Sequence, residues 1–127
     1  MTSLWIALGS ALGGVLRYWC SGLVAHWFGE TFPWGTLIVN VVGSLLIGLF
    51  ATLSAPDGRL LVGTSMRQFV MLGLLGGFTT FSSFSLQTLA LAQSGEWLRA
   101  AGNILGSVVL CLVGVWSGHA LAVAINR

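Results

Sequence analysis

The sequence predicts an all-α integral membrane protein with four transmembrane helices, and three observations lead to this fold class. Of the 127 residues, 56% are hydrophobic and only 6% are charged, and the mean hydropathy is +0.94. A soluble chain of this length would bury too little surface to hide so many apolar side chains. The apolar residues also fall into four long runs, and the segments between these runs are short.

Each run is long enough to cross a bilayer, which takes about 20 residues of helix. The runs cover approximately residues 3–28, 35–53, 68–92 and 98–125. Turn-forming residues at 29–33, 54–58 and 93–96 separate them, and a short interfacial helix is expected over residues 60–66. No run or linker suggests a soluble domain, so residues 1–127 are predicted to form a single transmembrane domain.

The third run contains a segment that is unusual for a lipid-facing helix. Residues 76–85 read GGFTTFSSFS, a pair of glycines followed by five hydroxyl side chains among three phenylalanines. Irregular backbone survives at membrane depth only where protein or a cavity covers it, because every backbone polar group there needs a partner. Polar atoms at that depth point to function, so the functional site is expected in this segment.

Small residues recur four positions apart on several runs, which lets helix backbones approach closely in lipid. The glycine pairs are Gly9/Gly13, Gly73/Gly77, Gly102/Gly106 and Gly114/Gly118, and Ser10/Gly14 and Ser44/Gly48 are similar pairs. Any one pair can serve a contact within the subunit. Their number in so small a chain favours assembly with another copy.

The arginines are distributed almost evenly between the two membrane faces. Arg59, Arg67 and Arg127 lie outside the runs on one side, and Arg99 lies on the other, with Arg17 inside the first run and nearer to that second side. This is a weak positive-inside bias. The chain could therefore insert in both orientations and pair antiparallel with itself, which would place a site near the midplane between the copies.

The second and third runs supply candidate anion ligands. The Asn40 amide can donate hydrogen bonds to an anion, or it can tie two helices together. Phe81 and Phe84 are three residues apart and share a helical face. Their ring edges are electropositive and can meet an anion, although such a pair is also ordinary packing.

The first and fourth runs supply the other candidates. Asn103, Ser107 and Cys111 fall at i, i+4 and i+8 and form one polar stripe. Arg17 either extends to the membrane surface or draws an anion into a vestibule.

The composition argues against several functional classes. Five arginines against three acidic residues give a net charge of +2, too sparse for a nucleic-acid surface. The three acidic residues all lie at turns, which argues against a proton-coupled cation exporter. No histidine lies at the depth of a candidate nucleophile, so an intramembrane protease is poorly supported and no enzyme is predicted.

Three segments stand out together, namely residues 13–18 (GGVLRY), 33–40 (PWGTLIVN) and 76–85 (GGFTTFSSFS). In order and spacing, and over essentially the whole chain, they resemble the Fluc/CrcB family of small microbial fluoride channels. The resemblance implies a dual-topology antiparallel homodimer in the cell inner membrane, with two pores that passively export fluoride and give fluoride resistance. It also implies a third helix broken near its centre.

The resemblance also implies roles for individual residues. A structural sodium ion, which is not transported, would be held by the backbone carbonyls of Gly76 and Thr79 from both copies. Dense donors without a fixed charge would replace the hydration shell of fluoride and still let it leave. The resemblance implies a fluoride pathway that includes Arg17, Asn40, Phe81, Phe84, Asn103 and Ser107, and the hydroxyls of Thr80 and Ser82 are expected to add donors to it.

Two departures from the family pattern qualify this expectation. Gln87 stands where many members carry a glutamate, and Cys111 and Val115 stand where hydroxyls would be expected. Two other functions remain open. One is a dual-topology small multidrug exporter, which should carry a membrane glutamate. The other is a structural membrane subunit that transports nothing.

Overall fold

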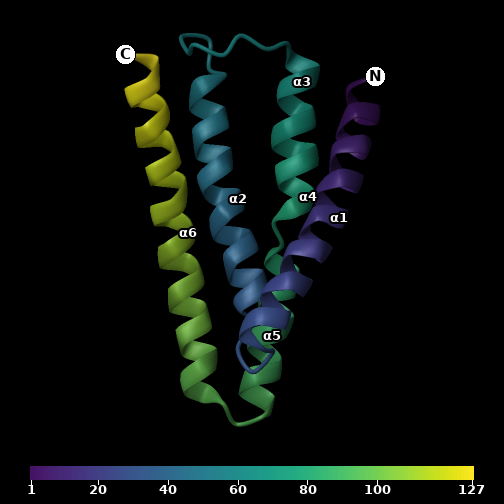
Figure 1. Ribbon diagram of the computed structural model, residues 1–127, viewed down its shortest axis with the longest axis vertical. Coiled ribbons are helices and arrows are strands. Elements are labelled where there is room, and N and C mark those ends of the chain that lie inside the picture. Colours follow the sequence, from purple (N-terminus) through teal and green to yellow (C-terminus); the bar gives the residue numbers. More distant parts are fainter.

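The computed structural model describes all residues 1–127 and shows an entirely helical chain (Figure 1). Helix α1 spans Thr2–Phe28, α2 spans Trp34–Leu53 and α6 spans Trp97–Asn126. Between α2 and α6, a long helical segment is divided into four parts. These are α3 (Thr64–Gln68), a π-helical stretch η1 (Phe69–Leu75), α4 (Gly76–Phe78) and α5 (Phe81–Gln93).

Three helical segments are long and apolar enough to cross a membrane, which identifies a membrane protein. They are Trp34–Leu53, Thr64–Gln93 and Trp97–Asn126. Helix α1 has the length, but Arg17, Tyr18 and Trp19 lower its hydropathy, and its crossing stays a prediction. The prediction of a short helix over residues 60–66 is wrong. Residues 60–63 are not helical, and α3 begins at Thr64 as an extension of the third segment.

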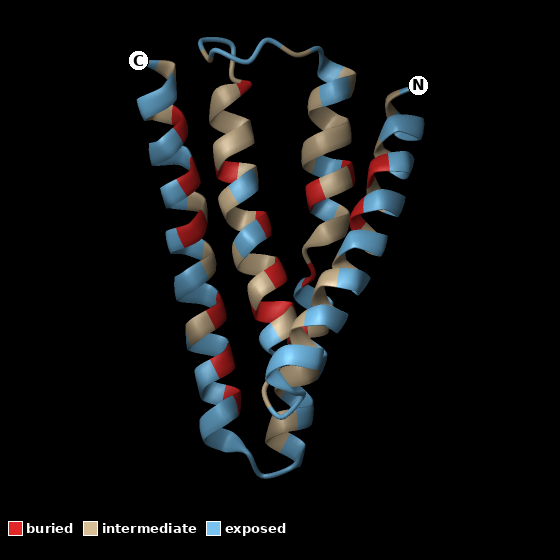
Figure 2. Ribbon diagram, in the orientation of Figure 1, coloured by how far each residue is buried: buried red, intermediate tan, exposed pale blue.

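The two chain termini and the α2–α3 connection lie at one end of the molecule, and the α1–α2 and α5–α6 connections lie at the other (Figure 1). Helices α2 and α6 pack side by side, whereas α1 packs against η1 and α4. Buried residues form narrow stripes on the inner faces of these helices (Figure 2). Only 18 of the 127 residues are buried, because apolar outer faces in lipid need no protein cover.

Glycines make the contact between α1 and the η1–α4 segment, which we call the α1 seam. A Cβ atom added to Gly9 or Gly13 would collide with backbone atoms of η1 and α4, and one added to Gly77 would lie 2.7 Å from the Ser10 carbonyl oxygen. Gly73 faces Gly9 directly, with the added Cβ 3.0 Å from the Gly9 Cα. Two of the predicted glycine pairs therefore pack against each other within one chain.

A second glycine seam joins α2 to α6. A Cβ atom on Gly48 would collide with the Val115 carbonyl oxygen, and one on Gly118 would collide with the Leu45 carbonyl oxygen. The pair Gly102/Gly106 differs, because nothing lies within 4 Å of either added Cβ. This pair makes no close helix contact inside the subunit.

Candidate functional site

The polar segment predicted to carry the site contains an interruption of the helix. Thr79 (φ −87°, ψ 157°) and Thr80 (φ −153°, ψ 112°) are extended, and they separate α4 from α5. The Thr79 amide still makes the helical bond to the Leu75 carbonyl oxygen at 3.0 Å, and the Thr80 amide is the first that does not donate to the carbonyl four residues earlier. The new helix starts at Phe81, and the Thr80 hydroxyl caps it by accepting from the Ser83 amide at 3.1 Å.

Asn40 on α2 satisfies the backbone of this interruption. Its Nδ2 donates to the Thr80 carbonyl oxygen at 3.0 Å, and its Oδ1 accepts from the Thr80 amide at 2.7 Å. The side chain thus pairs with both backbone polar groups of one extended residue, which hydrocarbon would leave without partners. Because Nδ2 carries two hydrogens, one of them remains available. The helix-tying role of Asn40, one of its two predicted roles, is present in the structure.

A hollow of about 380 Å³ lies beside the interruption, between α2, the start of α5 and α6. Its polar lining groups are Asn40, Ser44, Thr79, Thr80, Ser107 and Cys111, and its aromatic ones are Phe81 and Phe84. We call this hollow the polar cavity. Five of the eight predicted pathway residues line it, namely Asn40, Thr80, Phe81, Phe84 and Ser107.

The two phenylalanines form one unit at the wall of the polar cavity. Their ring centroids are 5.2 Å apart and their planes are inclined by 51°. Phe84 is buried, whereas Phe81 is 75% exposed within the single chain. A tilted pair of this kind can present a ring edge to the cavity.

Asn103 does not line the polar cavity, although its neighbour Ser107 does. The Asn103 side chain is 2% exposed, and both ends of its amide are occupied. Its Nδ2 donates to Thr88 Oγ1 at 2.9 Å, and its Oδ1 accepts from Ser107 Oγ at 3.3 Å. The expected single polar wall therefore divides into Ser107, which faces the cavity, and Asn103, which links α6 to α5.

Arg17 and Ser82 also lie away from the polar cavity. Arg17 is on α1, which contributes no residue to this hollow. Ser82 is exposed, and its hydroxyl oxygen lies 3.3 Å from Thr80 Oγ1. Of the two predicted cation ligands, Thr79 borders the cavity and Gly76 does not. Any role of these residues in transport stays a prediction.

Sequence reasoning missed two polar residues near the polar cavity. Ser44 lies four residues after Asn40 on the same face of α2, but it was interpreted only as a small packing residue. Thr88 lies four residues after Phe84, and its hydroxyl donates to the Phe84 carbonyl oxygen at 2.7 Å. The spacing of four from a predicted site residue was the available signal in both cases.

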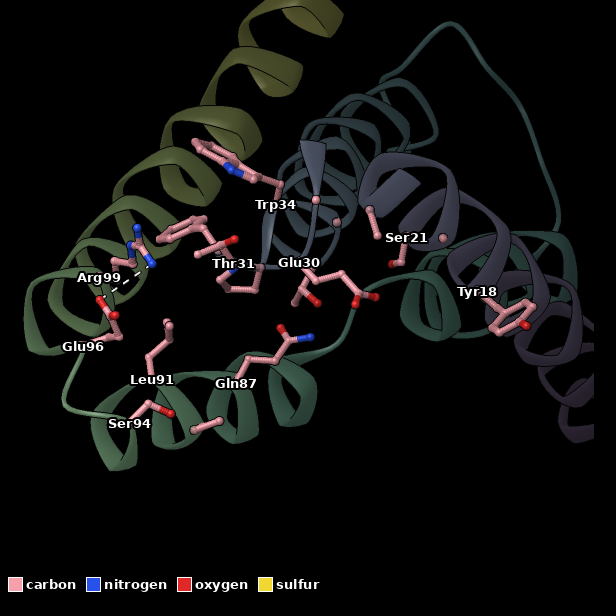
Figure 3. Close-up of a pocket in the computed structure, with 18 residues that line it drawn as sticks. Tyr18, Ser21, Glu30, Thr31, Trp34, Gln87, Leu91, Ser94, Glu96 and Arg99 are labelled. Carbon is pink, nitrogen blue, oxygen red and sulfur yellow. Dashed lines mark ion pairs between the residues drawn. The ribbon is translucent and has the colours of Figure 1, made fainter. Parts of the chain in front are cut away.

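A larger hollow of about 720 Å³ opens at the end of the molecule where the α1–α2 and α5–α6 connections meet (Figure 3). Gln87 on α5 lines it, and the Gln87 Oε1 atom is buried without a hydrogen-bond partner. Arg99 and Glu96 face each other at 3.7 Å on its rim. Thr36, four residues before Asn40, also lines this hollow.

The two hollows lie in succession along the same helices. Thr36 and Asn40 are one turn apart on α2, and Gln87 and Phe84 are one turn apart on α5. One turn advances about 5.4 Å along a helix. The larger hollow therefore leads from the end of the bundle toward the polar cavity.

Comparison with known proteins identifies the family. Residues 4–119 match the family described as CrcB-like protein, Camphor Resistance (CrcB). The chain belongs to the CrcB family. A relative of this CrcB chain from Opitutus terrae is 68% identical over 123 residues, which cover 97% of this chain and 93% of the relative. One from Rhodospirillum rubrum is 60% identical over 127 residues, which cover 100% and 98% respectively.

A third relative, from Methylocella silvestris, is 61% identical over 127 residues and covers 100% of this CrcB chain. Each of the three bears the name Fluoride-specific ion channel FluC. The matches extend over the interruption, the polar cavity and the larger hollow, because they span essentially the full chain. The family resemblance predicted from the three sequence segments is confirmed.

Proposed function

We propose that this chain is a fluoride-specific channel that lets fluoride leave the cell passively across the inner membrane and thereby gives fluoride resistance. The observation that carries the proposal is the polar cavity. Amide, hydroxyl and thiol groups and two ring edges converge there beside the helix interruption, and no arginine or carboxylate lines it. The three relatives named as fluoride-specific channels support the same function.

The physical mechanism follows from the cavity lining. Fluoride holds its hydration water strongly, so a pathway must offer donors close together as the water is removed. The free Nδ2 hydrogen of Asn40 and the edges of Phe81 and Phe84 are such donors. None bears a fixed charge, so the ion is bound weakly enough to leave. We place the approach to these groups through the larger hollow beside Gln87.

The predicted pathway residues outside the polar cavity take other roles in this proposal. Ser82 is exposed, and its hydroxyl lies next to that of Thr80, so it acts on the fluoride path through Thr80. Asn103 holds Ser107 and Thr88 in place from within the protein. Arg17 sits half-buried on α1 and attracts anions toward the membrane surface.

We further propose that the working unit is an antiparallel homodimer with dual topology and two pores. Phe81 lines the polar cavity but is 75% exposed in the single chain, so one wall of the path is open. A second copy can close that wall, with lipid surrounding the rest. The glycines at 102 and 106 leave open space beside α6 that can accept a neighbouring helix.

A structural sodium ion fits the interruption of the helix. The Thr80 amide donates to Asn40 Oδ1, so the Gly76 carbonyl lacks the donor that a continuous helix would provide. Carbonyl oxygens of Gly76 and Thr79 are suitable sodium ligands, because carbonyl dipoles replace a cation's hydration water. One chain supplies too few of them, so the same carbonyls of the second copy would complete the site. When bound, the ion would offset the negative ends of carbonyl dipoles where the two interruptions meet.

Fluoride efflux from liposomes tests the proposed function. Purified protein should release trapped fluoride without a proton gradient, and Phe81→Ile and Asn40→Asp should each lower that flux at least about tenfold. Unchanged flux in both variants would remove these residues from the path. Drug transport coupled to protons would indicate the multidrug exporter, and absence of any flux would indicate a structural subunit.

A further inference from the structure

Two serines face the polar cavity from different helices, Ser44 from α2 and Ser107 from α6. Both have a hydroxyl that can donate one hydrogen bond and accept two. A hydroxyl attracts an anion through its proton, whereas the lone pairs of the hydroxyl oxygen repel the anion. The question that separates the two serines is therefore where each proton already points.

The proton of Ser107 is committed to another side chain. The Thr88 hydroxyl lies 2.7 Å from the Phe84 carbonyl oxygen, which can only accept, so Thr88 must donate there. Thr88 Oγ1 then accepts from Asn103 Nδ2 at 2.9 Å, which turns Asn103 Oδ1 toward Ser107. Ser107 must therefore donate to Asn103 at 3.3 Å, and it presents only lone pairs to the cavity.

The proton of the Thr80 hydroxyl is also already used in a hydrogen bond. Its Oγ1 accepts from the Ser83 amide at 3.1 Å and lies 3.1 Å from Ser83 Oγ, to which it donates. The cap of α5 thus uses the Thr80 proton. The Thr79 hydroxyl also lines the cavity, and it donates its proton to the Leu75 carbonyl oxygen at 3.1 Å.

Ser44 is the exception among the cavity hydroxyls. Hydroxyls in helices commonly donate to the carbonyl four residues earlier, and Ser54, Thr79, Ser85 and Thr88 all do so here. Ser44 makes no such bond to the Asn40 carbonyl, and its oxygen is not among the buried polar atoms without a partner. Its proton is therefore free and open to the cavity.

We infer that Ser44 is a fluoride-binding residue of this pathway and its principal hydroxyl donor. With the free Nδ2 hydrogen of Asn40, it provides two uncommitted donors one helical turn apart on α2, in the same cavity as Phe81 and Phe84. Fluoride would pass from the Asn40 amide to the Ser44 hydroxyl, each replacing one water of its shell. This inference rests on the proposed function and adds the residue that recognises the ion beyond Asn40.

The test compares single-serine variants in the fluoride efflux assay, with each rate expressed per correctly assembled channel. Ser44→Ala should lower fluoride flux about tenfold, which corresponds to about 1.4 kcal/mol, and Ser44→Thr should retain most of it because the donor remains. Ser107→Ala should cause a smaller loss than Ser44→Ala. Ser117→Ala, at an exposed position of α6 outside both hollows, is the matched control and should match the unaltered protein.

The outcomes distinguish this inference from the proposed function. If the unaltered protein conducts fluoride but Ser44→Ala conducts equally well, or loses no more than Ser107→Ala, the assignment of Ser44 is overturned while the channel function stands. A loss shared by Ser44→Ala and Ser44→Thr would mean that the position matters for packing and not for donation, which also overturns it. If the unaltered protein passes no fluoride, the proposed function itself fails.

Discussion

The helical segments before and after Thr79–Thr80 are held in the bundle by different kinds of contact. Before the interruption, η1 and α4 pack on α1 through glycines whose added Cβ atoms would meet backbone atoms. After it, α5 is joined to α2 and α6 by side-chain hydrogen bonds from Asn40 and Asn103. Regular helix in lipid needs only close approach, because its backbone bonds are internal. Irregular backbone needs polar partners, and those partners bring donors to the place where an ion can use them.

The largest expected effect comes from placing a side chain in the α1 seam. Gly13→Val would drive a branched side chain into the backbone at Leu74 and Phe78, which cannot yield without separating α1 from η1 and α4. We expect a destabilisation of about 3 kcal/mol or more and little correctly folded protein after purification in detergent. The neighbouring Gly14 has nothing within 4 Å, so Gly14→Val is the matched control. Equal yields and melting temperatures for the two variants would contradict the seam.

The hydrogen bonds that hold the segment after the interruption depend first on Asn40. Asn40→Ala leaves the amide and the carbonyl of Thr80 without their partners, at about 1–3 kcal/mol for each unsatisfied group. Asn40→Asp keeps an acceptor for the Thr80 amide, but its second oxygen faces the Thr80 carbonyl oxygen and adds a charge at membrane depth, so this variant should also be destabilised. Thermal unfolding in detergent should rank the unaltered protein above both variants. Hydrogen exchange at the Thr80 amide should be fastest in Asn40→Ala, and unchanged exchange would contradict the role of Asn40 at the interruption.

Thr88 offers a smaller and more selective perturbation. Thr88→Val keeps the branched shape but removes the acceptor of Asn103 Nδ2, which should cost about 1–2 kcal/mol. Thr88→Ser keeps the hydroxyl and should stay close to the unaltered protein. A melting temperature lowered equally by both variants would show that Thr88 acts through its methyl group and not through the hydrogen bond.

The smallest expected effect is at Gln87. Its Oε1 atom is buried without a partner, so Gln87→Leu removes an unsatisfied acceptor and should change stability by less than about 1 kcal/mol, in the stabilising direction. Thermal unfolding of the variant would check this. A clear loss of stability would mean that the amide makes a contact in the assembled protein that the single chain does not contain.

The sequence predicted the all-helical class, which the structure confirms, and it indicated the polar segment beside which the polar cavity lies. Length and hydropathy are local properties, so the apolar runs could be recognised without knowing what they pack against. The hydroxyl-rich segment after Gly77 was also recognisable, because five hydroxyls in seven residues do not suit a lipid-facing helix. The prediction of a short helix over residues 60–66 failed because residues 60–63 belong to the connection after α2, and residues 64–66 are part of α3.

Other features depended on partners far away in the sequence. The spacing of Asn103 and Ser107 showed that they share a face, but not that the Asn103 amide turns to Thr88 and leaves the cavity to Ser107. Glycine spacing also could not separate Gly73, which meets α1, from Gly102, which meets nothing in the chain. Side-chain direction and the identity of the facing helix decide such contacts, and neither is encoded in the distance between residues along the chain.

By itself, the sequence determined that this is a helical membrane protein of the CrcB family with a polar segment at membrane depth. Hydrophobicity and short motifs are properties of consecutive residues, so they can be recognised without knowledge of the fold. Only the tertiary structure decided which hydroxyl protons are already committed and which one, on Ser44, remains open to the cavity. A hydrogen bond depends on the position of both partners, and these partners come together only when α2, α5 and α6 are packed.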